Sequence, residues 1–105
     1  MGKKVYNKLV RDKIPEIIQA QGKQLKTRVL GDEEYLEALL KKVEEEFAEL
    51  KVDLNVEELA DLHEVLRALA DALNISHDEV ETVRAEKAAK RGGFSQKIFL
   101  EEAEE

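Results

Sequence analysis

The chain has 105 residues, a formal net charge of −7 and no cysteine. This length predicts a single domain over residues 1–105, and the missing cysteines exclude disulfides, thiol chemistry and cysteine-based zinc sites. The negative charge argues against general nucleic-acid binding, which needs lysine and arginine to neutralise phosphates. Without a long apolar run or a signal peptide, we expect a cytoplasmic protein that does not bind membranes. A small core favours pairing with further copies, so a homodimer or larger homo-oligomer is expected.

The N-terminal third predicts one short helix between irregular segments. Residues 1–13 have no clean apolar period. Ile14 and Pro15 open a short helix, because proline fits the first helical turn, and Gly22 closes it. Residues 23–30 are expected to be extended.

The middle of the chain predicts two longer helices. Asp32 is the expected N-cap of a helix over residues 33–52, in which leucine, valine and phenylalanine recur at helical spacing. Asn55 is the expected cap of the next helix, from residue 56 to about residue 73, whose apolar stripe consists mainly of leucines.

The last third predicts a fourth helix and a short tail. Ser76 and Glu79 have the spacing of a capping box, and the helix should end before Gly92 and Gly93. Residues 94–100, FSQKIFL, predict a short strand or an ordered extended arm. The predicted fold is therefore all-α, a bundle of about four helices with short extended segments at both ends.

Two pairs of acidic residues are the strongest chemical signal. Glu46 and Glu49 are three residues apart on one predicted helix, and Glu58 and Asp61 are three apart on the next. Residues at this spacing are neighbours on a helix surface, so two antiparallel helices can bring both pairs to one point. Such oxygen ligands suit Mg²⁺ or Mn²⁺.

The position of Glu58 on its helix strengthens this interpretation. A helical projection places Glu58 between Val65 and Leu69, on the apolar side, and Asp61 at the edge of that side beside small residues. A carboxylate that faces an apolar surface must be paired, protonated or bound to metal. The alternatives to a metal site are an interhelical salt bridge and a side chain at the edge of the apolar stripe that extends its carboxylate to solvent.

The charge along the chain is segregated. Residues 1–30 and 84–97 are rich in lysine and arginine, whereas residues 31–82 are acidic. Two basic ends around an acidic middle suit an anionic ligand that is bridged to carboxylates by a cation. Ordinary segregation of charge on solvated surfaces would explain the same pattern.

The acidic pairs lie in the segments EEFAEL (45–50) and EELADL (57–62). Together they resemble the E-E-x-x-E…E-x-x-D signature of the MazG-type all-alpha NTP pyrophosphohydrolase superfamily, which includes phosphoribosyl-ATP pyrophosphohydrolase. YNKLVRDKIP (6–15) and KRGGF (90–94) are similar to segments of a small branch of it. The resemblance implies a helical, oligomeric fold and Mg²⁺-dependent cleavage of a nucleoside triphosphate between the α and β phosphates, giving a monophosphate and pyrophosphate.

The resemblance also assigns roles to residues. It implies that Glu46, Glu49, Glu58 and Asp61 hold the metal and that Glu45 orients a water or a ligand, so these five form the expected catalytic set. Only eight residues separate Glu49 from Glu58, fewer than is usual in the superfamily, which requires a tight turn near residues 53–55. The candidate substrate-binding cations are Lys8, Arg11, Lys13, Lys87, Lys90 and Arg91.

Three functions remain open from the sequence. The first is a pyrophosphohydrolase that removes non-standard or surplus nucleotides. The second is phosphoribosyl-ATP pyrophosphohydrolase, which would share the site but bind a different sugar and base. The third is a non-catalytic helical module, whose acidic rows would be solvated faces and whose role would be oligomerisation.

Overall fold

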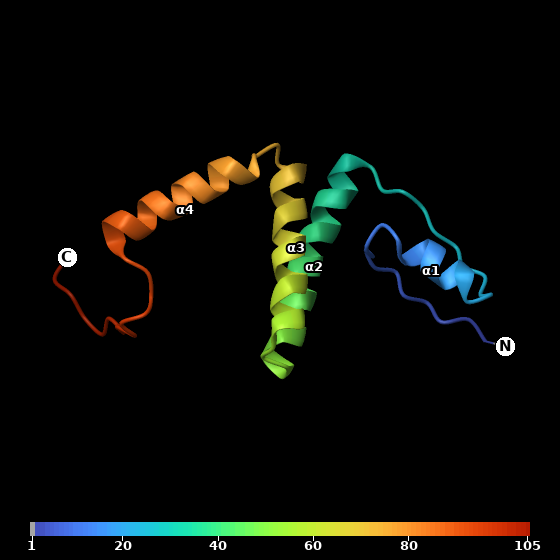
Figure 1. Ribbon diagram of the computed structural model, residues 1–105, viewed down its shortest axis with the longest axis horizontal. Coiled ribbons are helices and arrows are strands. Elements are labelled where there is room, and N and C mark those ends of the chain that lie inside the picture. The colour runs from blue at the N-terminus through green and yellow to red at the C-terminus, as the bar shows by residue number, and fades with distance from the viewer. Residues whose placement is uncertain (1) are drawn as a thin grey trace. The chain divides into compact units, whose positions relative to one another are not determined.

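A computed structural model describes residues 2–105, and its ribbon is shown in Figure 1. The helices are α1 (Ile14–Ala20), α2 (Asp32–Val52), α3 (Val56–Ala72) and α4 (His77–Arg91). No strand occurs among residues 2–105, and residues 94–100 are irregular, so the alternative of a short C-terminal strand was wrong. The prediction of an all-α fold with about four helices is confirmed. The chain divides into two compact units, Met1–Asn74 and Ile75–Glu105.

The ends of α1 follow from its proline and glycine. Pro15 lies in the first turn, where its missing N–H costs no intrahelical hydrogen bond. The helix ends at Ala20, and Gly22 then adopts a φ of +78°, a left-handed conformation that glycine reaches at little cost. The short predicted helix was therefore correct.

The caps of α2 and α3 differ. The N-cap of α2 is Gly31, with extended backbone and no side-chain hydrogen bond, so the prediction that Asp32 caps this helix was wrong. Asp32 is instead the first helical residue, where its negative charge complements the positive end of the helix dipole. Asn55 caps α3 as predicted, because its side chain accepts a hydrogen bond from the backbone N–H of Glu58 at 2.9 Å.

Helices α2 and α3 form an antiparallel hairpin, which lies at the centre of Figure 1. The turn between them spans residues 53–55 and is closed by hydrogen bonds from the Asp53 N–H to the Glu49 carbonyl and from the Asn55 N–H to the Asp53 carbonyl. Leu39 on α2 is the most buried side chain among the described residues, with 2% of its surface exposed. The tight turn that the sequence required is present, and it sets which residues of the two helices face each other.

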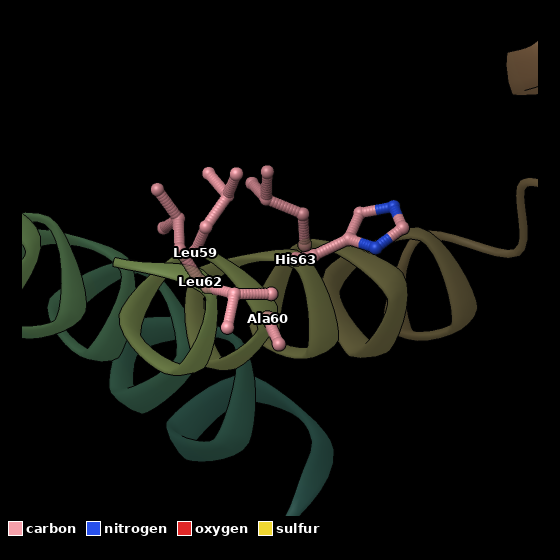
Figure 2. A pocket seen from close by; sticks show the side chains of 6 residues that line it. Leu59, Ala60, Leu62 and His63 are labelled. Atoms are coloured by element: carbon pink, nitrogen blue, oxygen red, sulfur yellow. The ribbon is translucent and has the colours of Figure 1, made fainter. Parts of the chain in front are cut away.

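The leucine stripe of α3 does not form a closed core. Leu59, Leu66 and Leu73 retain 57%, 45% and 47% of their surface exposed. On α2, Leu40 and Phe47 are about half exposed as well. Figure 2 shows Leu59 and His63 projecting from the side of α3 that lies away from α2, around a shallow apolar hollow. The periodicity identified an apolar face correctly, but this face is largely open to solvent.

The second unit contains α4. Ser76 accepts a hydrogen bond from the Glu79 N–H at 3.0 Å, which confirms the predicted capping serine. The helix ends at Arg91, and Gly92 has a φ of +83°, as expected for a glycine that stops a helix. No helix among residues 2–105 combines the length and the apolar character needed to span a bilayer.

Candidate metal centre

The facing sides of α2 and α3 bring carboxylates together near the turn of the hairpin. Glu46 on α2 lies with Glu58 and Asp61 on α3, and one carboxylate oxygen from each lies within 4.8 Å of the other two. Glu46 also forms a group with Glu45 and Glu49 on its own helix, in which one carboxylate oxygen from each residue lies within 4.8 Å of the other two. Glu46 therefore belongs to both groups, and together they contain all five of the predicted catalytic carboxylates.

Glu46 is the centre of this arrangement and is also the most buried of the five. Its side chain is 9% exposed. Its Oε1 atom lies 3.3 Å from the ammonium of Lys42, whereas its Oε2 atom is buried without a hydrogen-bond partner. A buried oxygen without a partner is costly, because it has lost its water and gained nothing in exchange.

Glu58 repeats this pattern on the other helix. Its Oε2 atom is also buried and without a hydrogen-bond partner. Residues of α3 that follow on the same side include Val65 and Ala68, and both are partly buried. Two residues of one carboxylate group, on opposite helices, thus each carry a buried oxygen without a partner, which is a need that a bound cation would satisfy.

The pKa shifts of Glu46 and Glu58 agree with the close approach of several carboxylates. Burial raises the pKa of Glu46, Lys42 acts in the opposite direction, and the neighbouring Glu49 adds to the rise. Burial likewise raises the pKa of Glu58, and the negative charges of Asp61 and Glu46 add to it. Both carboxyls therefore hold protons more tightly than ordinary glutamates, because nearby positive charge is insufficient to balance the cluster.

Three basic side chains contact the rim of the cluster. Lys42 lies 3.3 Å from Glu45 as well as from Glu46, and Lys8 lies 3.6 Å from Glu45. Arg11 donates a hydrogen bond to Asp61 Oδ1 at 2.7 Å. The structure thus places Lys8 and Arg11, two of the predicted substrate-binding cations, directly at the carboxylates.

Lys42 was missed by the sequence analysis. It lies three residues before Glu45 and four before Glu46, the spacing at which helical side chains pair, so this signal was available. Its side chain is only 15% exposed, which makes it a fixed part of the site rather than a mobile surface charge.

Of the other four predicted cations, one lies in the first unit and three lie in the second. Lys13 is the exposed residue before α1. Lys87, Lys90 and Arg91 lie on α4, in the second unit, and Lys90 and Arg91 occupy its last turn, where cations complement the helix dipole. Their role in binding a substrate remains a prediction.

A hollow with both polar and apolar walls borders the cluster along α2. It has a volume of about 350 Å³. Its walls come from the segment before α1 and from α2, and they consist of Tyr6, Asn7, Lys8, Leu9, Ala38, Lys41, Lys42 and Glu45. Glu45 and two lysines thus belong both to the hollow and to the rim of the carboxylate cluster.

Part of the chain is similar to a known protein. Over 43 residues the chain is 54% identical to an uncharacterised protein of Mycolicibacterium smegmatis, a region that covers 41% of this chain and 44% of that protein. The chain thus matches less than half of the length of this relative. No protein-family profile matches the chain, and no solved structure resembles it at a significant level.

Proposed function

We propose that this protein is a Mg²⁺-dependent nucleoside triphosphate pyrophosphohydrolase that cleaves between the α and β phosphates. The observation that carries the proposal is the pair of buried, unpartnered oxygens, Glu46 Oε2 and Glu58 Oε2, whose residues form one carboxylate group with Asp61. Hard oxygen ligands of this kind fit Mg²⁺ or Mn²⁺. The resemblance of the acidic segments to the MazG-type superfamily supports the choice of reaction.

The residues that would hold the cation are Glu46, Glu58 and Asp61, with Glu49 on the exposed side. When bound, Mg²⁺ would neutralise phosphate charge and polarise the phosphorus centre. Glu49 is exposed, in contrast to Glu46, so it is suited to reach a ligand from the solvent side. The buried Glu46 is suited to hold the cation from the protein side, because packing fixes its position.

Glu45 is the candidate to accept a proton from the attacking water. Its side chain is 32% exposed, so water reaches it, and Lys8 and Lys42 hold its carboxylate in place. A positioned carboxylate of this kind is a competent general base. The same two lysines, with Lys41, line the neighbouring hollow and would bind the anionic phosphates of the substrate.

The test of this function is pyrophosphate release from ribo-, deoxyribo- and modified nucleoside triphosphates, and from phosphoribosyl-ATP, with Mg²⁺ and with EDTA. We expect release from at least one substrate in Mg²⁺ and none above background in EDTA. Preference for phosphoribosyl-ATP would identify the alternative enzyme of the same superfamily. No release from any substrate, together with no change of melting temperature on adding Mg²⁺, would contradict the proposal.

Self-association is the second function that a specific observation favours. Leu59 and Leu66 are about half exposed on one face of α3, and residues of this kind usually lie against another apolar surface. A second copy of the chain offers the same face, and two identical faces fit a two-fold interface. We therefore propose a homodimer or larger homo-oligomer that buries this face.

Leu66→Glu is expected to weaken this association by about tenfold or more, because it would place a charge in the apolar interface. Sedimentation velocity measures the change. Leu100→Glu adds the same charge to an exposed leucine of the tail and should leave the association intact. A wild-type protein that sediments as a monomer at all concentrations would contradict the homo-oligomer. Circular dichroism checks that the helices of the Leu66→Glu variant are retained.

A further inference from the structure

The segment before α1 crosses the carboxylate cluster. We call residues 5–13 the N-terminal strap. It has no helix or strand, it bends at Asn7, which has a φ of +43°, and Leu9 is its one half-buried residue while the others are exposed. Lys8 of the strap lies 3.6 Å from Glu45 on α2, and Arg11 bonds Asp61 on α3 at 2.7 Å. The strap is therefore attached to both helices of the hairpin through carboxylates of the candidate centre.

Arg11 pairs with a carboxylate that the metal would need. The group formed by Glu46, Glu58 and Asp61 contains two buried oxygens without partners, and Glu46 is more than nine-tenths buried. Asp61 is the member of this group that is ion-paired to the strap. The guanidinium of Arg11 thus adds positive charge to the α3 side of a group whose α2 side is paired with Lys42, at a residue where a divalent cation would supply more.

The Arg11–Asp61 pair is also the pair that is easiest to displace. Arg11 is 58% exposed and Asp61 is 41% exposed, and exposed ion pairs contribute little to stability. By contrast, the Lys42–Glu46 pair is 15% and 9% exposed. A cation that entered the cluster would therefore exchange with Arg11 rather than with Lys42.

We propose that Arg11 is an exchangeable counter-ion: it occupies Asp61 in the metal-free protein, is displaced when a divalent cation binds, and is thereby released for the polyphosphate of the substrate. This inference rests on the proposed metal centre and adds an order of events to it. The released guanidinium stays near the site, because Lys8, three residues earlier in the strap, pairs with Glu45 at 3.6 Å. Guanidinium groups bind phosphate with two parallel hydrogen bonds, which suits Arg11 to this second partner.

The test compares Mn²⁺ affinity, measured from the electron paramagnetic resonance signal of free Mn²⁺, in the wild type, Arg11→Gln and Arg28→Gln at low ionic strength. Arg28 is the matched control, because its guanidinium also bonds a carboxylate of the first unit, that of Glu34, but outside the cluster. We expect Arg11→Gln to bind Mn²⁺ about two- to fivefold more tightly than wild type, which is the scale of an exposed ion pair. Arg28→Gln is expected to bind Mn²⁺ like the wild type.

Hydrogen exchange of the strap gives a second readout that does not depend on turnover. Adding Mg²⁺ to the wild type should increase amide exchange in residues 5–13, and Arg11→Gln should show this faster exchange without metal. Equal Mn²⁺ affinity in wild type and Arg11→Gln, or a strap that Mg²⁺ protects, would overturn the counter-ion role and leave the metal centre standing. Absence of Mn²⁺ binding in both proteins would instead overturn the metal centre, and the counter-ion role with it.

Discussion

Glu46→Gln is expected to abolish Mg²⁺-dependent pyrophosphate release while making the metal-free protein more stable. Glu46 belongs to both groups of carboxylates, so its loss removes the ligand that the two groups share. Loss of an outer-sphere partner of a metal site costs about 10–100-fold in activity or affinity, and loss of a direct ligand should cost at least that. The amide of glutamine keeps the shape of the side chain, which leaves the packing of α2 against α3 intact.

The gain in stability has a separate physical reason. The metal-free protein keeps a buried carboxylate with one unpartnered oxygen beside Glu49, and both burial and this neighbour disfavour its charge. Removing the charge relieves that cost. A gain of about 1 kcal/mol corresponds to a rise of roughly 4–8 °C in the melting temperature of a domain of this size.

The measurement combines pyrophosphate release in Mg²⁺ with thermal unfolding in EDTA. Glu44→Gln is the control, because Glu44 is an exposed glutamate of the same helix that belongs to neither carboxylate group. We expect it to retain both activity and melting temperature. A Glu46→Gln variant that is less stable and still active would show that Glu46 is a salt-bridge partner of Lys42 and not a metal ligand.

Glu58→Gln is expected to change how stability depends on pH. Burial and the charges of Asp61 and Glu46 raise the pKa of Glu58 above its usual 4.5, so the folded protein holds this proton more tightly than the unfolded chain does. Folding therefore takes up a proton between pH 4.5 and the raised value, and the contribution of Glu58 to stability falls as the pH rises through this window. Glutamine has no such proton to lose.

The measured quantity is the free energy of unfolding of Glu58→Gln minus that of the wild type, both in EDTA. This difference should increase as the pH rises through this window and stay constant above it. Glu34 and Glu81 act in the opposite direction, because Arg28 and Arg84 lower the pKa of their carboxyls. These two residues are present in both proteins and cancel in the difference. Glu64→Gln, an exposed position on the same helix, is the control for loss of one charge.

Saturating Mg²⁺ provides the complementary result. A cation that binds only the folded protein stabilises it by mass action, and it binds most strongly when the carboxyls are ionised. The wild type should therefore gain stability from Mg²⁺ as the pH rises, whereas Glu58→Gln should gain little. A difference between the two proteins that is flat with pH, in EDTA and in Mg²⁺, would rule out a special environment for Glu58.

The starts and ends of the helices were predictable because they depend on local chemistry. Asn55 and Ser76 cap helices by bonding an N–H three residues ahead, and Gly92 adopts a conformation that other residues avoid. Each of these signals lies within a few residues of sequence. The one cap that was predicted wrongly, Asp32, failed because a residue suited to the N-cap is also suited to the first turn, and Gly31 took the cap.

The long-range features were not predictable in the same way. The period of the leucines on α3 identifies an apolar face, but not whether another part of the same chain covers it. The Arg11–Asp61 pair joins residues 50 apart in sequence, and the charge of Arg11 and its place in the YNKLVRDKIP segment had assigned it to a substrate. By contrast, the approach of Glu46 to Glu58 could be predicted from the sequence, because both residues lie close to one short turn and face along the apolar side of their helices.

The turn at residues 53–55 has a consequence for how the protein is made. All five carboxylates of the candidate centre lie within one helical hairpin, so their approach requires only the closure of a very short loop. Contacts this local form early in folding, because little chain entropy is lost in making them. On a growing chain the hairpin is complete before α4 has been synthesised. Carboxylates that repel each other must then be held together from the start, and a cation captured at this stage would assist folding before it assists catalysis.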